Sequence, residues 1–360
     1  MKLIRFLLAL AVMLALGAAA FGFWVQSQLN GTIVVPECAR HFKIPRGERV
    51  DETVNRLVAA GVLKQALPLR LYMKIAKIRP VIKAGNYTFP SPVSPLGVLS
   101  KLEAGGDFSR LTVVEGWTRW DIAAAMCRVP DLKLKDANAA LVLMSNTRQI
   151  KAIDPEAPNL EGYLYPDTYF IAPDSTASEL IDEMVRHFKD VWQKDLSQAA
   201  STANLSPHAL VTVASIVETE AKLKEERPII ASVIYNRIRR HIPLAMDSTV
   251  VYASKLVGKW KNNGKVYQSD IDRRSPYNTR QVYGLPPGPV GSPGGSSLKA
   301  AIAPAKTTYI FYVREPSRND GAHNFYDNAA DFEAGVQALR LWEKKRDAAA
   351  AAQGKKAHKP

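Results

Sequence analysis

The sequence of 360 residues contains only two cysteines, Cys38 and Cys127. Two cysteines are too few for a disulfide framework. They can pair with each other in an oxidising compartment, or each can be a small, half-buried side chain, which is the interpretation we favour. The sequence has no Cys-x-x-Cys motif and no cluster of histidine and cysteine, so we expect neither a metal nor another cofactor.

Long apolar runs are scarce as well, and the one of note lies at the N-terminus. Residues 6–25 are uncharged and largely apolar, and Lys2 and Arg5 precede them. Twenty helical residues extend about 30 Å, which is the thickness of the hydrocarbon core of a bilayer. We therefore expect residues 1–30 to form a cytoplasmic stub and a single transmembrane anchor, with Trp24 at the far interface.

The N-terminal run has a second interpretation, a cleaved signal peptide, because residues 18–20 are three alanines near a plausible cleavage site. The apolar part of a signal peptide usually has about 7–15 residues, and this run is longer, so we favour the anchor. Both interpretations export the rest of the chain. With the anchor, we expect a single-pass protein of the inner membrane whose catalytic part is periplasmic.

Acidic residues are few relative to basic ones, 34 against 48, which gives a net charge of +14. The tail, residues 343–360, has six basic and two acidic residues around an alanine run, and we expect it to be disordered. An exported protein does not meet nucleic acid. The basic charge therefore favours anionic polymers and lipid head groups as partners.

Two stretches near the N-terminus have the pattern of small α+β modules. Residues 42–47 and 111–116 each resemble a short strand that ends in a glycine turn, and a helical pattern follows each of them. A further strand is predicted over 82–89 and a short helix over 96–102. We expect one module at 33–105 and a second small α+β or connecting segment at 106–155.

The remaining part, 156–342, is predicted to be a larger mixed α+β domain. Helical periodicity covers 178–196 and 225–240. Another helix begins at Ser206 and Pro207, a good N-cap followed by a proline suited to the first turn. Its apolar surface is wide enough for burial on most sides. A long loop rich in proline and glycine follows residue 270, and a buried strand is predicted over 308–313.

Glu218 and Glu220 end that apolar helix in the motif Ser-Ile-Val-Glu-Thr-Glu at 215–220. A carboxyl group that is partly removed from water has a raised pKa, because burial disfavours its charged form. A general acid that works near neutral pH needs this property. The alternative is that both residues lie on the surface, since glutamate is common at helix ends.

Two other polar groups could bind a ligand. Asp247 and Thr249 lie directly before an apolar run, which suits either a binding site or the N-cap of a helix. Tyr277, Asn278 and Thr279 belong to a polar loop at 275–279. A tyrosine ring can stack on a sugar, and the other two side chains can bond sugar hydroxyls, but a tight turn has the same composition. We interpret His323 as structural, because no serine or cysteine nucleophile lies nearby.

The order of these motifs resembles the YceG-like (MltG) family of endolytic murein transglycosylases. The resemblance rests on residues 213–220, 226–237, 247–250, 275–279 and the Gly-Leu-Pro-Pro-Gly-Pro segment at 284–289. Residues 83–87 and the Leu-Glu-Gly-Tyr-Leu-Tyr-Pro-Asp-Thr-Tyr segment at 160–169 fit the same family. The resemblance covers nearly the whole chain, and several long motifs occur in the same order as in the family.

The resemblance implies an α+β fold with a transmembrane helix, a LysM-like module at 33–105 and a catalytic domain at 156–342 with a lysozyme-like catalytic helix. It implies that Glu218 is catalytic. It also implies that the cleft is lined by a set of substrate-binding residues, Glu220, Asp247, Thr249, Tyr277, Asn278 and Thr279. Three positions depart from the usual family pattern: Ala245, Ser248 and Ser292 replace glutamine, proline and asparagine.

The expected reaction is cleavage of peptidoglycan glycan strands by a single glutamate, which leaves a 1,6-anhydro end on N-acetylmuramic acid. An anchored enzyme reaches nascent strands near the membrane, and penicillin-binding proteins are expected partners by the same resemblance. Two alternatives stay open. One is a lysozyme-like hydrolase, in which Glu220 or Asp247 serves as the second carboxylate. The other is a non-catalytic scaffold that binds peptidoglycan.

Overall fold

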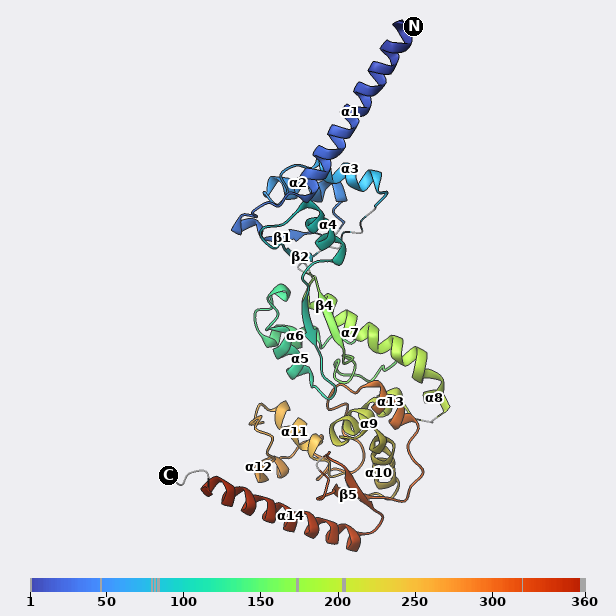
Figure 1. Cartoon of the computed structure of the whole chain (residues 1–360). Coiled ribbons are helices and arrows are strands. Elements are labelled where there is room, and N and C mark those ends of the chain that lie inside the picture. The colour runs from blue at the N-terminus through green and yellow to red at the C-terminus, as the bar shows by residue number, and fades with distance from the viewer. Residues whose placement is uncertain are drawn as a thin grey trace. The chain divides into compact units, whose positions relative to one another are not determined.

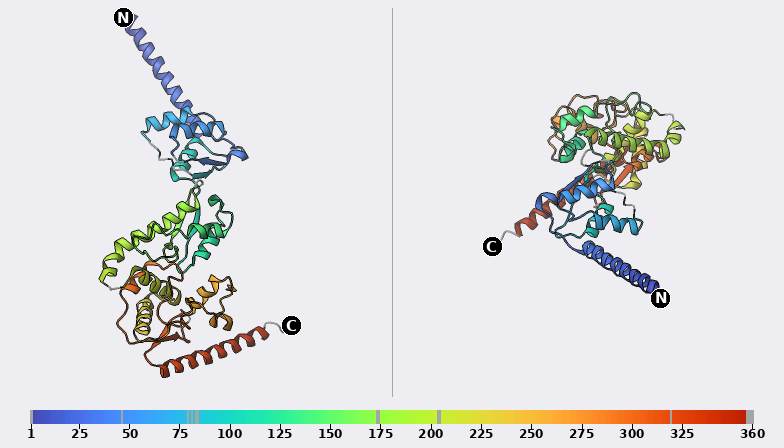
Figure 2. Two further views of the ribbon diagram at one scale, coloured as in Figure 1. Left: turned by 180° about the vertical axis from the view of Figure 1, so that it is seen from behind. Right: turned by 90° about the horizontal axis from the view of Figure 1, so that it is seen from above.

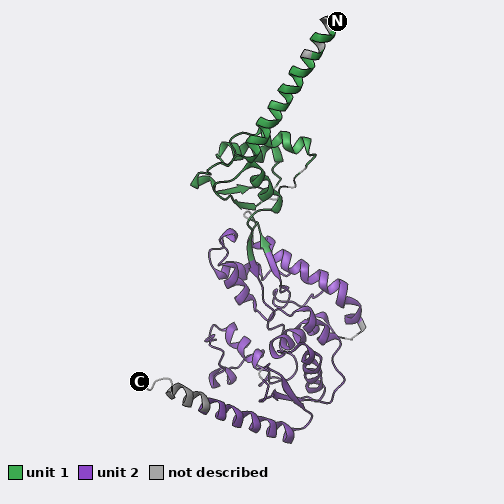
Figure 3. Ribbon diagram, viewed as in Figure 1, with its two compact units in different colours: residues 1–110, 170–176 green, residues 111–169, 177–360 purple. Residues whose placement is uncertain are grey.

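The structure is a computed structural model that describes residues 2–45, 47–78, 80, 82, 85–172, 175–202, 205–318 and 320–356. Its mixed α+β chain forms two compact units, coloured separately in Figure 3. Unit 1 comprises residues 1–110 and 170–176, and unit 2 comprises 111–169 and 177–360. Most of the segment expected at 106–155 lies in unit 2.

Unit 1 begins with the long helix α1 (Lys2–Asn30), shown in Figure 1. Residues Ile4–Asn30 are long and apolar enough to cross a membrane, a property that a signal sequence near the N-terminus shares. The last turn of α1 belongs to the folded part of unit 1, because Leu29 is buried in its core. The exposed apolar part of α1 is therefore directly continuous with the packed part of unit 1.

The rest of unit 1 has the order β1 (His41–Ile44), α2 (Val50–Ala59), α3 (Leu67–Ile75), β2 (Gly85–Thr88) and α4 (Pro95–Ala104). β1 and β2 pair antiparallel, with Phe42 opposite Tyr87, and the two helices α2 and α3 lie between them in the chain. The helix α3 was not predicted from the sequence. Arg46 of the first expected turn, and Lys83 and Ala84 of the second expected strand, lie outside the described residues.

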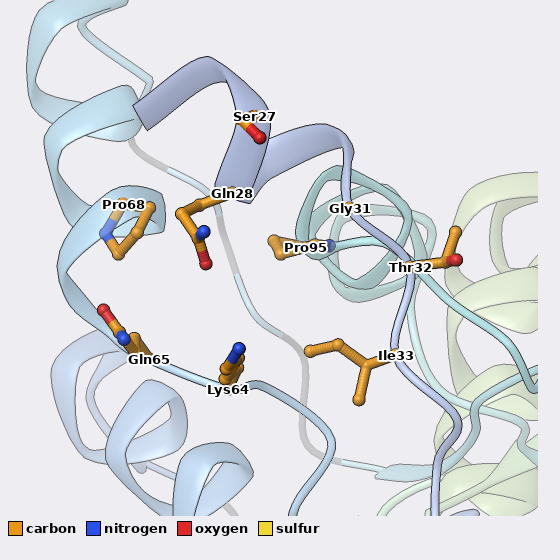
Figure 4. A pocket seen from close by; sticks show the side chains of 9 residues that line it. All are labelled: Ser27, Gln28, Gly31, Thr32, Ile33, Lys64, Gln65, Pro68 and Pro95. Atoms are coloured by element: carbon orange, nitrogen blue, oxygen red, sulfur yellow. The ribbon is translucent and has the colours of Figure 1, made fainter. Parts of the chain in front are cut away.

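Figure 4 shows a cavity in unit 1 at the end of α1. Its volume is about 230 Å³, and much of its lining is polar: it includes the amides of Gln28 and Gln65 and the amine of Lys64. Pro68 and Pro95, at the starts of α3 and α4, contribute to the wall.

Both cysteines are free, exposed thiols, so the expectation of half-buried side chains is wrong. Each lies in a short helical segment or directly at its end. Cys38 lies in the 3₁₀ turn Glu37–Ala39, and Cys127 is the C-cap of α5 (Arg119–Met126).

Unit 2 starts where β3 (Ser109–Thr112) pairs with β4 (Thr168–Ile171), the strands through which the chain passes between the units. Between them lie α5 and α6 (Ala137–Leu143), which pack on each other. α7 (Ala177–Val191) continues as a π-helical turn, Trp192–Leu196, and then as α8 (Ser197–Thr202). The predicted apolar face of α7 is confirmed, because its members are all buried: Leu180, Ile181, Met184, Val185 and Phe188.

The centre of unit 2 is α9 (Pro207–Glu220), which packs against α10 (Arg227–Arg239), α11 (Asp247–Leu256) and α13 (Gly295–Ile302). A short helix, α12 (Gln268–Ile271), packs on α11. The hydroxyl of Ser206 accepts the Ala209 N–H, which confirms the predicted N-cap. Every residue of α9 from Leu210 to Glu218 is buried, as its wide apolar surface predicts.

The C-terminal elements are β5 (Phe311–Arg314), β6 (His323–Tyr326) and α14 (Ala329–Lys356). The strand predicted at 308–313 starts later and is only half-buried, because it belongs to an isolated two-stranded ribbon with α14 packed on it. The tail is helical through Lys356, where disorder was expected. Alanine has the highest helix propensity, and this outweighs the charge of the segment. The last turns of α14 project beyond the rest of unit 2 in both views of Figure 2.

Candidate active site

Two cavities of unit 2 share a wall that carries Glu220 and Asp247. The Arg237 cavity, of about 540 Å³, is lined by Glu220, Arg237, Ile242, Pro243, Ala245, Met246, Asp247, Arg280, Phe311, Tyr312 and Phe332. The Trp260 cavity, of about 390 Å³, is lined by Gly116, Thr118, Thr219, Glu220, Asp247, Ser248, Val251, Tyr252, Lys255, Trp260, Gly264, Val266 and Val290. An elongated ligand that fills both cavities lies over the carboxylates of Glu220 and Asp247.

Glu220, the last residue of α9, is the half-buried carboxylate common to both cavities. Its Oε2 accepts the Tyr312 hydroxyl at 2.8 Å, and its Oε1 accepts the Ser248 hydroxyl, also at 2.8 Å. These two donors hold the side chain in one orientation. Tyr312 comes from β5, and no sequence motif pointed to it as part of the site.

Glu218 precedes Glu220 by two residues of α9 and is only 8% exposed. Its Oε1 accepts Nη2 of Arg227 at 2.6 Å, and its Oε2 accepts the backbone N–H of Gly294 at 2.8 Å. Gly294 is the N-cap of α13, where a helix favours negative charge. Burial raises the pKa of Glu218 above its ordinary value, although the Gly294 N–H and Arg227 oppose that rise.

Gly116 separates Glu218 from the Trp260 cavity. A side-chain carbon placed on Gly116 would lie 3.9 Å from Cγ of Glu218, and Gly116 itself lines the cavity. Its segment is held by backbone hydrogen bonds from Gly116 to Ser292 and from Ser292 to Trp117, each 2.8 Å long. Glu218 therefore lies directly behind a cavity wall that has no side chain at this point.

Asp247 is the first residue of α11 and is exposed. Its Oδ1 accepts Nη2 of Arg280 at 2.6 Å. The N-cap of α11 is Met246, which has no capping side chain, so the interpretation of Asp247 as a capping residue is wrong. Its carboxylate instead pairs with Arg280, which lines the same cavity.

Three predicted contact residues, Thr249, Asn278 and Thr279, are each 0% exposed. The hydroxyls of Thr249 and Thr279 lie 2.7 Å apart, and the amide of Asn278 donates to the carbonyls of Ile271 and Arg273. In the free protein these three side chains are therefore enclosed in the fold and line neither cavity. Their polar groups are used to fix the loop at 271–279 beneath α11.

Tyr277 is half-buried and packs its ring against that of Tyr252 in a tilted arrangement, with ring centres 4.7 Å apart. Tyr252 lines the Trp260 cavity, and Tyr277 itself does not. It supports the cavity from behind. His323 donates its backbone N–H to Glu226, and its ring nitrogen Nδ1 lies 2.7 Å from the same carboxylate, which agrees with a structural role.

The three departures from the family pattern all lie at the site. Ser248 donates to Glu220 through its hydroxyl and, at 3.4 Å, its N–H; the proline usual in the family could make neither bond. Ala245 adopts a φ of +51° and lines the Arg237 cavity. The hydroxyl of Ser292 is buried without a hydrogen-bond partner in the described part of the chain.

Gly162, in the 160–169 segment, lies where the chain leaves no room for a side chain. Its φ is +85°, and a side-chain carbon there would come within 2.6 Å of Pro289 and 2.9 Å of Val211. The proline loop at 284–289 can therefore lie on α9 only because residue 162 has no side chain. Among the described residues, no group of three or more His, Cys, Asp or Glu is placed to hold a metal ion.

Comparisons with known proteins agree on one family. The model of the YceG-like family matches residues 42–338. The chain is 33% identical over 287 residues to an endolytic murein transglycosylase of Bacillus subtilis (strain 168), covering 76% of this chain and 78% of that protein. It is 30% identical to the endolytic murein transglycosylase of Streptococcus pneumoniae D39, covering 92% of this chain and 64% of that longer protein.

A crystal structure of a YceG-like protein from Listeria monocytogenes is similar as well, with a TM-score of 0.58 and 29% identity. The match covers 82% of this chain and 97% of the Listeria chain. The groove with its carboxylates thus belongs to a mixed α+β fold that is shared across nearly the whole of a solved structure. This chain belongs to the YceG-like family.

Proposed function

We propose that this protein is a lytic transglycosylase that cleaves peptidoglycan glycan strands internally, with Glu218 as its acid and base. The observation that carries the proposal is a buried carboxyl group with a raised pKa directly behind the wall of a groove. Similarity to proteins named endolytic murein transglycosylases supports the substrate class. Cavities on both sides of Glu220 suit a strand that continues in both directions.

In the proposed mechanism, protonated Glu218 donates its proton to the glycosidic oxygen between N-acetylmuramic acid and N-acetylglucosamine, and the bond from that oxygen to C1 breaks. The C6 hydroxyl oxygen of the same muramic acid then bonds to C1. Its proton returns to the Glu218 carboxylate. The product carries a 1,6-anhydro end, no water is consumed, and one glutamate serves both proton transfers.

Access to the substrate is the demanding step of this proposal, because the Glu218 side chain is only 3% exposed in the free protein. The proposal requires the side chain to turn from Arg227 toward Gly116 when a strand binds. Catalytic hydrogen bonds often form fully only in the substrate complex. In this view α9 is the counterpart of the catalytic helix of lysozyme.

The main test replaces Glu218 with glutamine in the full chain and measures products from uncrosslinked strands by mass spectrometry. We expect anhydro ends from the wild type and a loss of roughly 10²–10⁴-fold in the variant, the usual contribution of a positioned proton donor. Glu225→Gln is the matched control, because Glu225 is exposed and does not line either cavity. Anhydro ends at the wild-type rate from Glu218→Gln would remove the assignment.

A hydrolase is the second candidate, because Glu220 and Asp247 both line the two cavities and either could position water. A hydrolase yields a reducing end, which is one water heavier than an anhydro end. Glu220→Gln separates the two further. We expect it to slow cleavage and still leave anhydro ends, whereas a hydrolase that depends on Glu220 for water would lose all activity.

We also propose that α1 anchors the protein in the inner membrane with a cytoplasmic N-terminus, so that nascent strands and penicillin-binding proteins lie within its reach. Deleting residues 1–22 keeps Leu29 in the core of unit 1. We expect this truncated protein to cleave soluble strands at the normal rate and to be found in the soluble fraction instead of the membrane fraction. Loss of cleavage in solution would contradict the role of α1 as an anchor alone.

For the region 33–105 we propose a LysM-like, glycan-binding role. The strand–helix–helix–strand order supports it, as does the cavity of Figure 4, where Gln28 and Gln65 offer amide groups to sugar hydroxyls. Gln65→Ala is expected to weaken strand retention without changing the cleavage products. If the protein were a scaffold, deleting 33–105 would abolish its cellular function and Glu218→Gln would not.

A further inference from the structure

Arg237 lines the Arg237 cavity and forms no ion pair among the described residues. It lies near the end of α10, where Nε donates to the Ile310 carbonyl and Nη1 to the Leu244 carbonyl, each at 2.5 Å. No acidic side chain of the described residues lies within ion-pair distance of it. Burial lowers the pKa of Arg237 and so does neighbouring Arg280, whereas Tyr312 and Glu220 raise it. A half-buried cation without an ion-pair partner favours the binding of an anion.

The guanidinium of Arg237 is also fixed in position at the wall of a cavity. Its carbon lies 5.2 Å from the ring centre of Phe311, and Phe332 from α14 stacks on that ring at 4.7 Å. Its remaining terminal nitrogen, Nη2, has no hydrogen-bond partner among the described residues. A cation already held by backbone carbonyls and an aromatic ring loses little freedom when a ligand binds.

A second guanidinium lines the same cavity. Arg280 uses Nη2 to pair with Asp247 and is exposed, so its other N–H groups can still bind a ligand. Guanidinium groups bind carboxylates more strongly than neutral acceptors, often through two parallel hydrogen bonds. The Arg237 cavity thus combines two such groups with three aromatic rings, next to Glu220.

We propose that the Arg237 cavity binds a carboxylate of the stem peptide that the glycan strand carries, and that the enzyme thereby selects peptide-bearing strands. This inference rests on the proposed function. In an intact strand the lactyl group of muramic acid is joined to the peptide as an amide, so the sugars are neutral and the carboxylates belong to the peptide. A guanidinium without an ion-pair partner binds such a carboxylate more strongly than it binds a neutral sugar hydroxyl.

The test compares two preparations of the same uncrosslinked strands, one with free peptide carboxylates and one with those carboxylates blocked as methylamides. For the wild type we expect kcat/KM to be about tenfold higher on the free acid, the difference that one charged hydrogen bond supplies. Arg280→Gln is expected to lose most of that preference, mainly through KM. Arg274→Gln is the matched control, since Arg274 is exposed on the same loop and lies outside both cavities.

Two further variants keep the test sharp. Phe332→Ala opens the cavity from α14 without changing charge, and we expect it to reduce the preference less than Arg280→Gln does. The Glu218→Gln variant allows strand affinity to be measured without cleavage, so the cavity is tested even if no strand is cut. Equal rates or affinities for the two strands in the wild type overturn the inference. An Arg280→Gln variant that binds and cleaves both strands less well by the same factor also overturns it. Absence of anhydro products from either strand is a failure of the proposed function instead.

Discussion

Replacing Arg227 with methionine is expected to destabilise the protein much more at pH 8 than at pH 5. In the wild type, the Arg227 and Glu218 side chains are 6% and 3% exposed and their charged atoms lie 2.6 Å apart. Removing one partner of such a buried pair leaves an uncompensated charge, which costs about 3–5 kcal/mol. This cost applies only where Glu218 is ionised.

At low pH the buried carboxyl group is protonated, so the variant loses the hydrogen bond to Ser296, the contact with Glu115 and packing, about 1–2 kcal/mol in all. Without Arg227 the pKa of Glu218 in the folded state rises further above that of the unfolded chain. As pH increases between those two pKa values, the unfolded chain releases a proton that the folded state retains. The stability of the variant therefore falls with pH in this interval.

Urea unfolding at pH 5 and pH 8 measures the two free energies of unfolding, and the double variant Arg227→Met/Glu218→Gln is the control. We expect the extra loss at pH 8 to be about 2–3 kcal/mol and to vanish in the double variant. An equal loss at both pH values would refute the reasoning, because Arg227 would then act through Ser296 and Glu115 alone. In cleavage assays the basic limb of the pH profile should move to higher pH.

Two other substitutions test the scaffold of the site. Burial raises the pKa of Glu161 from 4.5 to about 7. The folded state therefore loses about 3 kcal/mol of stability as pH rises between these two values. Glu161→Gln should abolish that part of the pH dependence, which urea unfolding measures. An unchanged pH profile in this variant would contradict the shift. Gly162→Ala should cost about 2–5 kcal/mol in thermal or urea unfolding, because it adds a clash with Pro289 to the strain of a positive φ. Gly258→Ala, with φ +65° and open space around it, should cost only about 1–2 kcal/mol, and similar losses at both glycines would rule out the clash.

Local patterns determined several elements of this protein. The apolar run at the N-terminus predicted α1, and Ser206 with Pro207 predicted the start of α9. Both predictions depend on residues adjacent in the chain, whose preferences act without distant partners. The order of motifs also identified the family, which the comparisons then showed.

Local patterns failed where a distant segment decides the environment. The polar residues Thr249, Asn278 and Thr279 have the composition of a binding loop, yet each is satisfied inside the fold by backbone or hydroxyl groups. The alanine-rich tail has a charge pattern typical of disorder, yet it is the second half of α14. Composition alone does not distinguish a buried hydrogen bond from one offered to a ligand.

The sequence by itself determined that two glutamates end a buried helix. Successive helical residues turn by about 100°, so Glu218 and Glu220 face different sides of α9. Only the tertiary structure decided which of them meets Arg227 and Gly294, and which meets Tyr312, 92 residues away. The physical reason is that burial and charge partners set the chemistry of a carboxyl group, and packing brings those partners from remote parts of the chain.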